Sequence, residues 1–177
     1  IEEHSVELKE KIPISRLFKY KLFVFGIFAG FFNLVLYTLL EPILSDRLTE
    51  IGVPEEKLGQ YFCIQPFVYS FVSIFVDGLI LKKIHKRVCL IIGFAIFAVG
   101  FIILGPSGLL FFFEPSKLLA CFGLFILGIG CSLSFVPIFP ELIESVVFDF
   151  EDRIEDLNNT VASLMNASYG SAAVGQL

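Results

Sequence analysis

The sequence has few charged residues and lacks the motifs of several common enzyme classes. Lys, Arg, Asp and Glu make up 18% of the 177 residues, whereas soluble domains carry about 25%. There is no HExxH metal motif, no GxSxG nucleophile motif and no Walker phosphate-binding loop, which disfavours a metalloprotease, a serine hydrolase and an ATP-driven pump. We therefore expect a protein that is not an enzyme and that uses no cofactor.

Cysteine and histidine are sparse as well. The sequence has 2 histidines and 4 cysteines, and each cysteine lies inside an apolar segment: Cys63, Cys89, Cys121 and Cys131. Free cysteines in such segments behave as small hydrophobic residues. We expect neither a disulfide framework nor a metal site.

Hydrophobic residues make up 56% of the sequence and are concentrated in blocks. A helix needs about 20 residues to cross the hydrocarbon core of a bilayer. The segments that meet this length are 22–44, 58–81, 88–105 and 118–142, and a fifth, 157–177, is more polar and looks truncated. The blocks predict an all-α, polytopic membrane helical bundle of about five transmembrane helices over residues 21–177.

The two ends of the sequence differ from this bundle. Residues 1–20 are rich in charge and are predicted to be a cytosolic linker. The chain begins at Ile1 without a methionine, and its last apolar segment stops at Leu177 without a closing flank. We expect the chain to be a fragment of a longer protein.

Lysine and arginine are distributed unevenly between the predicted loops. Ten lie at one end of the bundle: Lys9, Lys11, Arg16, Lys19, Lys21, Lys82, Lys83, Lys86, Arg87 and Arg153. Three lie at the other end: Arg47, Lys57 and Lys117. Because basic loops stay in the cytoplasm, the N-terminus is predicted to be cytosolic, in the plasma membrane or a vesicle or organelle membrane. We expect the basic loop to contact anionic lipid and not nucleic acid.

Polar side chains recur at helical spacing in four of the five segments. Lipid cannot hydrogen-bond a polar group, so such residues face a cavity or another helix. The segment 88–105 has no strongly polar side chain and is predicted to face lipid. This pattern predicts a solute or proton pathway between the other four helices. Its residues are Asn33, Tyr37, Glu41, Gln65, Tyr69, Ser73, Ser134 and Asn166.

Glycines indicate close contacts between helices, and prolines indicate bends or breaks within them. Gly26 and Gly30 form a small-xxx-small pair, for which close helix packing is the favoured interpretation. Pro66 is expected to loosen the second helix. Pro137 and Pro140 are expected to bend or break the fourth helix near its end.

The loop GLILKKIHKR after the second segment resembles the loop motif of the major facilitator superfamily, G-x-x-x-D-[RK]-x-G-[RK]-[RK]. Gly78, Lys83, Lys86 and Arg87 match the motif. The sequence departs from it at two positions: Lys82 stands where the motif has Asp, and His85 stands where it has its second Gly. The lost Asp puts the usual charge-relay role of this loop in doubt.

Two further stretches resemble one branch of this superfamily. LLEPIL, residues 39–44, resembles the Leu-Glu-Pro signature of the seventh helix in vesicular-amine-type transporters, and GIGCSLSFVPIFPEL, residues 128–142, resembles their tenth helix. The resemblance implies helices seven to eleven of a twelve-helix transporter, with the seventh, eighth, tenth and eleventh around a central cavity and the ninth outside.

The resemblance also implies a function and its partners. A transporter of this type moves a small organic solute by alternating access, and the branch implies a proton-coupled organic cation or amine. The expected partners are the solute, protons, membrane lipid and the missing N-terminal half of the same chain. The alternative is a five-span membrane scaffold or partner subunit that transports nothing, but a scaffold has no reason to keep polar residues on four helices while sparing one.

Two interpretations of Glu41 stay open. From Lys21 to Glu41 an α-helix rises about 30 Å at about 1.5 Å per residue, which puts Glu41 at the outer edge of the hydrocarbon. In the first interpretation Glu41 ends the helix, assisted by Pro42. In the second it belongs to an outer gate or to a site that exchanges a proton for a solute.

We expect the other acidic residues near the helix ends to form an ion pair or to be solvated. Asp77 is expected to form an interfacial ion pair with Lys82 or Lys83. Glu141 and Glu144 are expected to be solvated at the cytosolic end of the fourth helix.

Overall fold

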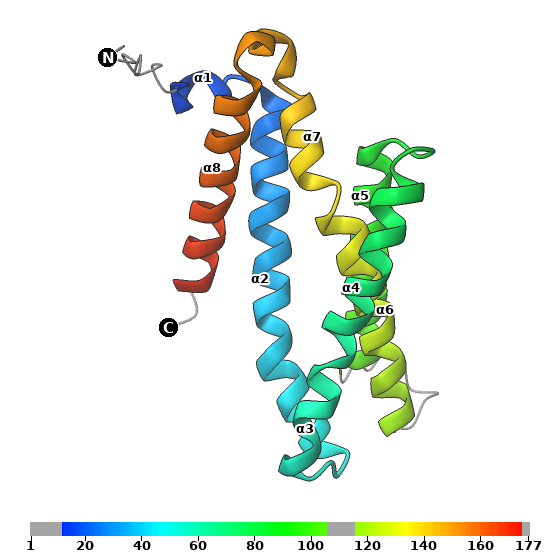
Figure 1. Ribbon diagram of the computed structural model, residues 1–177. Helices are drawn as coiled ribbons and strands as arrows, with labels where there is room; N and C mark the ends of the chain where they lie inside the picture. Colours follow the sequence, from blue (N-terminus) through cyan, green and yellow to red (C-terminus); the bar gives the residue numbers. More distant parts are fainter. Residues whose placement is uncertain (1–11, 106–115, 175–177) are drawn as a thin grey trace, which may run out of the picture.

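The computed structural model describes residues 12–105 and 116–174, and the regular elements in this part of the chain are all helices, with no β-strand (Figure 1). Four helical segments are long and apolar enough to cross a membrane: Lys21–Glu50, Glu55–Ile80, Lys86–Leu104 and Lys117–Asp149. The predictions of an all-α fold and of several helices that could cross a membrane are thereby confirmed. Helix α8, Ile154–Val174, does not meet the same criteria, and a fifth span stays a prediction.

Helix α2 spans Lys21–Glu50 and is longer than the predicted segment. It passes through Pro42 without ending, so the interpretation of Glu41 and Pro42 as the helix end is wrong. Proline removes one backbone hydrogen bond from a helix. Leu40 before the proline and Leu44 and Leu48 after it are buried at intervals of four in a core with residues of α5 and α6. This packing holds the helix together beyond the proline.

Breaks do occur close to prolines in the second and fourth spans, as predicted. Helix α3, Glu55–Phe62, stops at Cys63, and α4, Ile64–Phe75, continues the span. Pro66 would clash with the carbonyl of Phe62 four residues earlier, which explains a break at this point. The π-helical segment η1, Val76–Ile80, completes the span.

The fourth span is divided in the same way. Helix α6, Lys117–Phe135, ends just before Pro137, and α7, Ile138–Glu144, contains Pro140. Two short 3-10 helices, η3 at Val147–Asp149 and η4 at Glu151–Arg153, then lead into α8.

Part of the predicted cytosolic linker packs onto the bundle. Helix α1, Ile14–Leu17, precedes α2, and the side chains of Ile12 and Leu17 are buried in a core with α7 and α8. The hydroxyl of Tyr20 donates a hydrogen bond to Asp149 in η3. Apolar residues in this short segment give it a face to bury.

Figure 1 shows two groups of helices: α8 lies beside α2, and α4, α5 and α6 lie together, with α7 between the groups. Two main hydrophobic cores follow from this arrangement. One joins the start of α2 to α7 and α8 around Phe23, Leu142 and Val161. The other joins the second half of α2 to α5 and α6 around Leu44, Phe97 and Leu127. The middle of α2, around Asn33, lies between the two.

Helix α5, Lys86–Leu104, packs on α6 at very short range. A Cβ atom added at Gly93 would overlap the backbone nitrogen of Ser134, and one added at Gly130 would overlap the backbone of Phe97. Only glycine permits this approach. Ile91 and Val99 on the other side of α5 are exposed, so α5 buries one face and leaves the other for lipid.

The predicted pair Gly26 and Gly30 also serves helix packing. A Cβ atom at Gly26 would meet the side chain of Leu142 at 2.6 Å, and one at Gly30 would meet the ring of Tyr169 at 3.6 Å. The favoured interpretation of this pair is confirmed.

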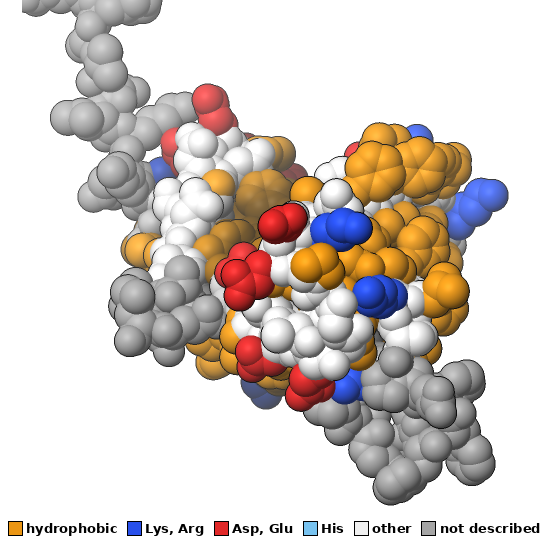
Figure 2. All heavy atoms as spheres, turned by 90° about the horizontal axis from the view of Figure 1, so that it is seen from below, with side chains coloured by type: hydrophobic (Ala, Val, Ile, Leu, Met, Phe, Trp, Pro, Cys, Tyr) orange, Lys and Arg blue, Asp and Glu red, His pale blue; other side chains and the backbone are white. Residues whose placement is uncertain are grey.

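The charged residues gather at the two ends of the bundle. Most of the described lysines and arginines lie in the first residues of α2 and α5 and in the short segments that lead into them, at one end in Figure 1, and α3 lies at the other end. Figure 2 looks onto the α3 end, where acidic and basic side chains cluster over the centre and hydrophobic side chains cover the flanks. This charge distribution fits a bundle whose long axis crosses a membrane.

Candidate functional site

A cavity of about 360 Å³ lies between α2, α4 and α6, and we call it the polar cavity because polar groups stand at several points of a wall that is otherwise apolar. Its walls contain amide, hydroxyl and thiol groups together with aromatic rings, and no charged side chain. The lining residues are Asn33, Leu34, Tyr37, Gln65, Pro66, Tyr69, Ser70, Cys131 and Phe135. Four of the predicted pathway residues therefore meet in one cavity: Asn33, Tyr37, Gln65 and Tyr69.

The cavity lies near the middle of the candidate spans. Asn33 is about 18 Å along α2 from Lys21, and Cys131 is about 21 Å along α6 from Lys117, at about 1.5 Å per residue. These two helices enter from opposite ends of the bundle (Figure 1), and the hydrocarbon core of a bilayer is about 30 Å thick. The polar groups therefore lie close to mid-depth.

Asn33 links α2 to α6 through a hydrogen-bonded network. Its side-chain amide donates to Oγ of Ser134 at 2.6 Å, and its Oδ1 accepts from the thiol of Cys131 at 3.9 Å. The Ser134 hydroxyl in turn donates to the carbonyl oxygen of Cys131 at 3.2 Å. Asn33 and Ser134 are almost completely buried. The network fixes the Asn33 amide at the cavity wall, because rotating it would break bonds at both ends.

Gln65 lines the same cavity from α4, but its side-chain hydrogen bonding differs from that of Asn33. Its side chain is 3% exposed, and its Nε2 atom has no hydrogen-bond partner. Close contact between α4 and α6 holds this part of the wall in place, since a Cβ atom at Gly128 would lie 2.9 Å from the backbone oxygen of Gln65.

Three aromatic rings form a row from the cavity toward α8; Tyr69 and Phe135 line the cavity, and Tyr169 packs behind Phe135. The rings of Tyr69 and Phe135 meet edge to face with centroids 6.2 Å apart, and Phe135 stacks on Tyr169 at 5.6 Å. The Tyr169 hydroxyl is buried without a hydrogen-bond partner. Phe135 and Tyr169 were not predicted as site residues, because an aromatic residue in an apolar run gives no signal that separates it from core.

Ser134, Ser73, Glu41 and Asn166 do not line the cavity. Ser134 is connected to the cavity by its hydrogen bond with the lining residue Asn33. The hydroxyl of Ser73 donates to the carbonyl oxygen of Ser70. Glu41 and Asn166 are exposed. Residues spaced by four drift around a helix of 3.6 residues per turn, so a long row at this spacing cannot stay on one face.

Helix α8 turns its polar residues away from the cavity. Its apolar residues Leu157, Val161 and Met165 pack in the core with α2 and α7, and this places Asn159, Ser163 and Asn166 on an exposed face. The cavity is therefore lined by three of the four predicted helices. Helix α5 contributes no lining residue, in agreement with its predicted place outside.

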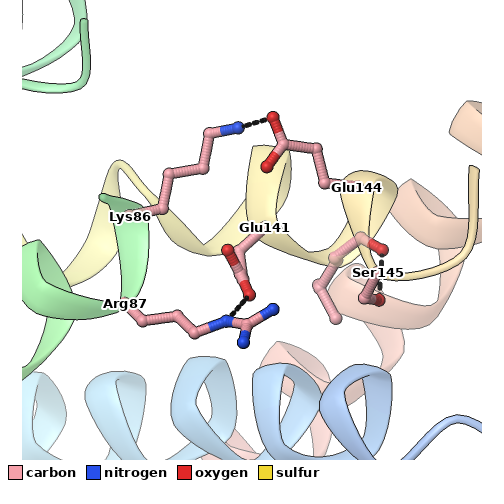
Figure 3. A network of polar contacts seen from close by, with 6 residues as sticks. Lys86, Arg87, Glu141, Glu144 and Ser145 are labelled. Carbon is pink, nitrogen blue, oxygen red and sulfur yellow. Dashed lines mark hydrogen bonds and ion pairs between the residues drawn. The ribbon is translucent and has the colours of Figure 1, made fainter. Parts of the chain in front are cut away.

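The residues of the loop motif separate into two groups. Lys86 and Arg87 begin α5 and reach toward α7 (Figure 3), where Lys86 pairs with Glu144 and Nε of Arg87 lies 2.5 Å from Oε1 of Glu141. Gly78 lies in η1, and Lys82 and Lys83 are exposed. The carboxylates Glu141 and Glu144 are thus ion-paired.

Two expectations about acidic residues, those for Glu141 and Asp77, are wrong, and the expectation for Glu144 is confirmed. Glu141 is 5% exposed and not solvated, because α7 turns it toward the start of α5. Glu144 is exposed to solvent, as expected, and also forms an ion pair with Lys86. Asp77 lies in η1 with its side chain exposed. In the described part of the chain it forms an ion pair with neither Lys82 nor Lys83.

A second hollow is an apolar groove of about 900 Å³ between α2 and α5. Phenylalanine dominates its walls, and the rings of Phe32 and Phe94 approach to 6.2 Å across it. No ionisable side chain lines this groove. The groove shares no lining residue with the polar cavity.

The described residues hold no cluster of His, Cys, Asp or Glu that could bind a metal. All four cysteines are free. A comparison of the chain with known protein families, curated proteins and solved structures finds no match. Function must therefore be argued from the site itself.

Proposed function

We propose that the chain is part of a secondary active transporter of the major facilitator type, which moves a small organic solute by alternating access. The observation that carries the proposal is the uncharged polar cavity at mid-depth between three candidate spans. Polar residues inside a membrane are costly and mark solute or ion pathways. Solute sites of secondary transporters lie near the midplane between helices with interrupted backbones, and the two spans that contain α4 and α6 are both broken close to a proline.

The proposed solute is an organic cation or amine. The cavity presents the rings of Tyr37, Tyr69 and Phe135, and neither Lys nor Arg lines it. A cation against an aromatic face gains about 0.5–2 kcal/mol. The volume of about 360 Å³ falls within the range of about 300–1,000 Å³ that small-molecule pockets occupy.

Glu41 is the proposed proton-exchanging group. It lies one turn beyond Tyr37 on α2 and is exposed. In this proposal the N-terminal half of the protein, which the resemblance implies, faces Glu41 and completes the pathway. A carboxylate at that position can give up a proton when a cationic solute arrives and take it back when the solute leaves.

The second candidate function is that of a membrane scaffold or partner subunit. The observation that favours it is the apolar groove between α2 and α5, because a transmembrane helix of another subunit could fill it. Transport activity separates the two candidates, since a scaffold takes up no solute.

The test is uptake of radiolabelled butyltrimethylammonium by proteoliposomes that contain the native protein, under an imposed pH gradient. We expect uptake that depends on the gradient. Asn33→Leu should reduce it at least tenfold, and the exposed control Asn159→Leu should leave it unchanged. Glu41→Gln should abolish its dependence on pH. Absence of uptake at every gradient, with folded protein verified by circular dichroism, would overturn the proposal in favour of the scaffold.

A further inference from the structure

Four buried side-chain atoms of the described residues have no hydrogen-bond partner: Gln65 Nε2, Ser132 Oγ, Glu141 Oε2 and Tyr169 Oη. Of these residues, only Gln65 lines the polar cavity. A buried amide N–H that has given up water without gaining a partner destabilises the protein. Such an atom in a cavity wall is expected to meet its partner on a ligand.

The neighbouring polar groups do not satisfy Gln65. The Asn33 amide donates to Ser134, and the Ser70 hydroxyl donates to the carbonyl of Pro66 at 2.8 Å. The thiol of Cys131 is within interaction range of the Gln65 side chain, but a thiol sulfur is a weak acceptor. The Nε2 atom is left with donor capacity that no oxygen of the described residues satisfies.

We infer that Gln65 is a specificity residue that donates a hydrogen bond to an oxygen acceptor on the solute. This inference rests on the proposed function and narrows its solute class to organic cations that carry an ether, ester or carbonyl oxygen. The ammonium group of such a solute lies against the rings of Tyr37, Tyr69 and Phe135, and its oxygen accepts from Gln65. A cation of the same size with a methylene in place of that oxygen leaves Gln65 unpaired.

Two quaternary cations of equal charge and equal heavy-atom number provide the test. One is 2-methoxyethyltrimethylammonium, which carries an ether oxygen, and the other is butyltrimethylammonium, which has a methylene at that position. Binding of each to the purified native protein is measured by isothermal titration calorimetry. Because both are quaternary, neither changes its own protonation with pH. We expect the ether to bind about tenfold more tightly, as the loss of one buried hydrogen bond predicts.

The variant Gln65→Leu should bind both cations with equal affinity. Its thermal stability without ligand should equal or exceed that of the native protein, because the leucine removes an unpaired polar group. The control Gln60→Leu, on the exposed surface of α3, should keep the preference for the ether.

The possible outcomes separate this inference from the proposed function. Equal binding of both cations to the native protein would overturn the role of Gln65 and leave the cation site standing. Binding of neither cation would overturn both proposals. A preference for the ether that survives in folded Gln65→Leu protein would show that another group recognises the oxygen.

Discussion

The guanidinium Nε of Arg87, at the start of α5, lies 2.5 Å from Oε1 of Glu141 on α7. The two residues are not equally buried: the Glu141 side chain is 6% exposed and that of Arg87 is 49% exposed. The second oxygen of Glu141 has no hydrogen-bond partner. Among the described residues, Arg87 is therefore the one ion-pair partner of the buried Glu141 carboxylate. The pair connects the start of the third span to the end of the fourth.

Replacing Arg87 by alanine should lower the stability more than replacing the neighbouring Lys86 by alanine. In Arg87→Ala the carboxylate of Glu141 is left buried without its partner, which should lower the free energy of unfolding by about 1–3 kcal/mol. Lys86 pairs with the exposed Glu144, and pairs of this kind contribute about 0–1 kcal/mol. Thermal unfolding of Lys86→Ala in the same detergent provides the control. Equal losses in both variants would contradict the buried role of Glu141.

Neutralising Glu141 should reverse part of the loss in Arg87→Ala. Glutamine has the same shape as glutamate and carries no charge, so Glu141→Gln should make the arginine nearly dispensable. We expect the double variant to be more stable than Arg87→Ala alone. The measurement is a double-mutant cycle of thermal stability. Additive losses would show that the two side chains do not interact.

Much of this fold could be predicted from the sequence, because apolar blocks of sufficient length are a strong signal. The breaks near Pro66 and Pro137 were also predictable, because they follow from the missing backbone N–H of proline. The continuation of α2 through Pro42 was not, because it depends on Leu44 and Leu48 finding partners in α5 and α6. Such contacts join residues far apart in the sequence.

The site was predictable in part. Asn33, Gln65 and Tyr69 were recognised because polar residues are rare in apolar segments, and the cavity contains them. The burial of Glu141 was missed, since the sequence next to Pro140 does not reveal which way α7 turns. The orientation of α8 was missed for a related reason: its polar and apolar residues both follow helical spacing, and only packing decides which face is inward.

Alanine at Gly93 should disrupt the contact between α5 and α6. The added Cβ atom would overlap the backbone of Ser134, and backbone atoms cannot move aside as a flexible side chain can. We expect Gly93→Ala to lower the free energy of unfolding by about 1–3 kcal/mol. Gly59 in α3 has no atom within 4 Å of its added Cβ, so Gly59→Ala should be neutral or stabilise by about 0.4–1 kcal/mol. Thermal unfolding of both variants checks the contrast.

The ring of Tyr169 should contribute to the stability of the fold, and its hydroxyl should not. The hydroxyl is buried without a partner, so Tyr169→Phe should leave thermal stability unchanged or raise it slightly. Tyr169→Ala removes the ring that stacks on Phe135 and covers Gly30, and loss of a large aromatic side chain from a packed site costs about 3–5 kcal/mol when fully buried. Because Tyr169 is only partly buried, we expect a smaller loss. A clear loss in Tyr169→Phe would point to a hydrogen bond from the hydroxyl.

The cysteines allow the cavity to be probed chemically. Cys131 lines the cavity and Cys89 is buried between α5 and α6, so a small methanethiosulfonate reagent that enters the cavity should modify Cys131 and spare Cys89. Cys63 is exposed and should react fastest. Butyltrimethylammonium should slow the modification of Cys131 at least tenfold without protecting Cys63, because it occupies the space next to the thiol. Mass spectrometry of the modified protein distinguishes the sites, with Cys131→Ser as the control for assignment. Modification of Cys131 that proceeds at the same rate with and without the cation would place the cation outside this cavity.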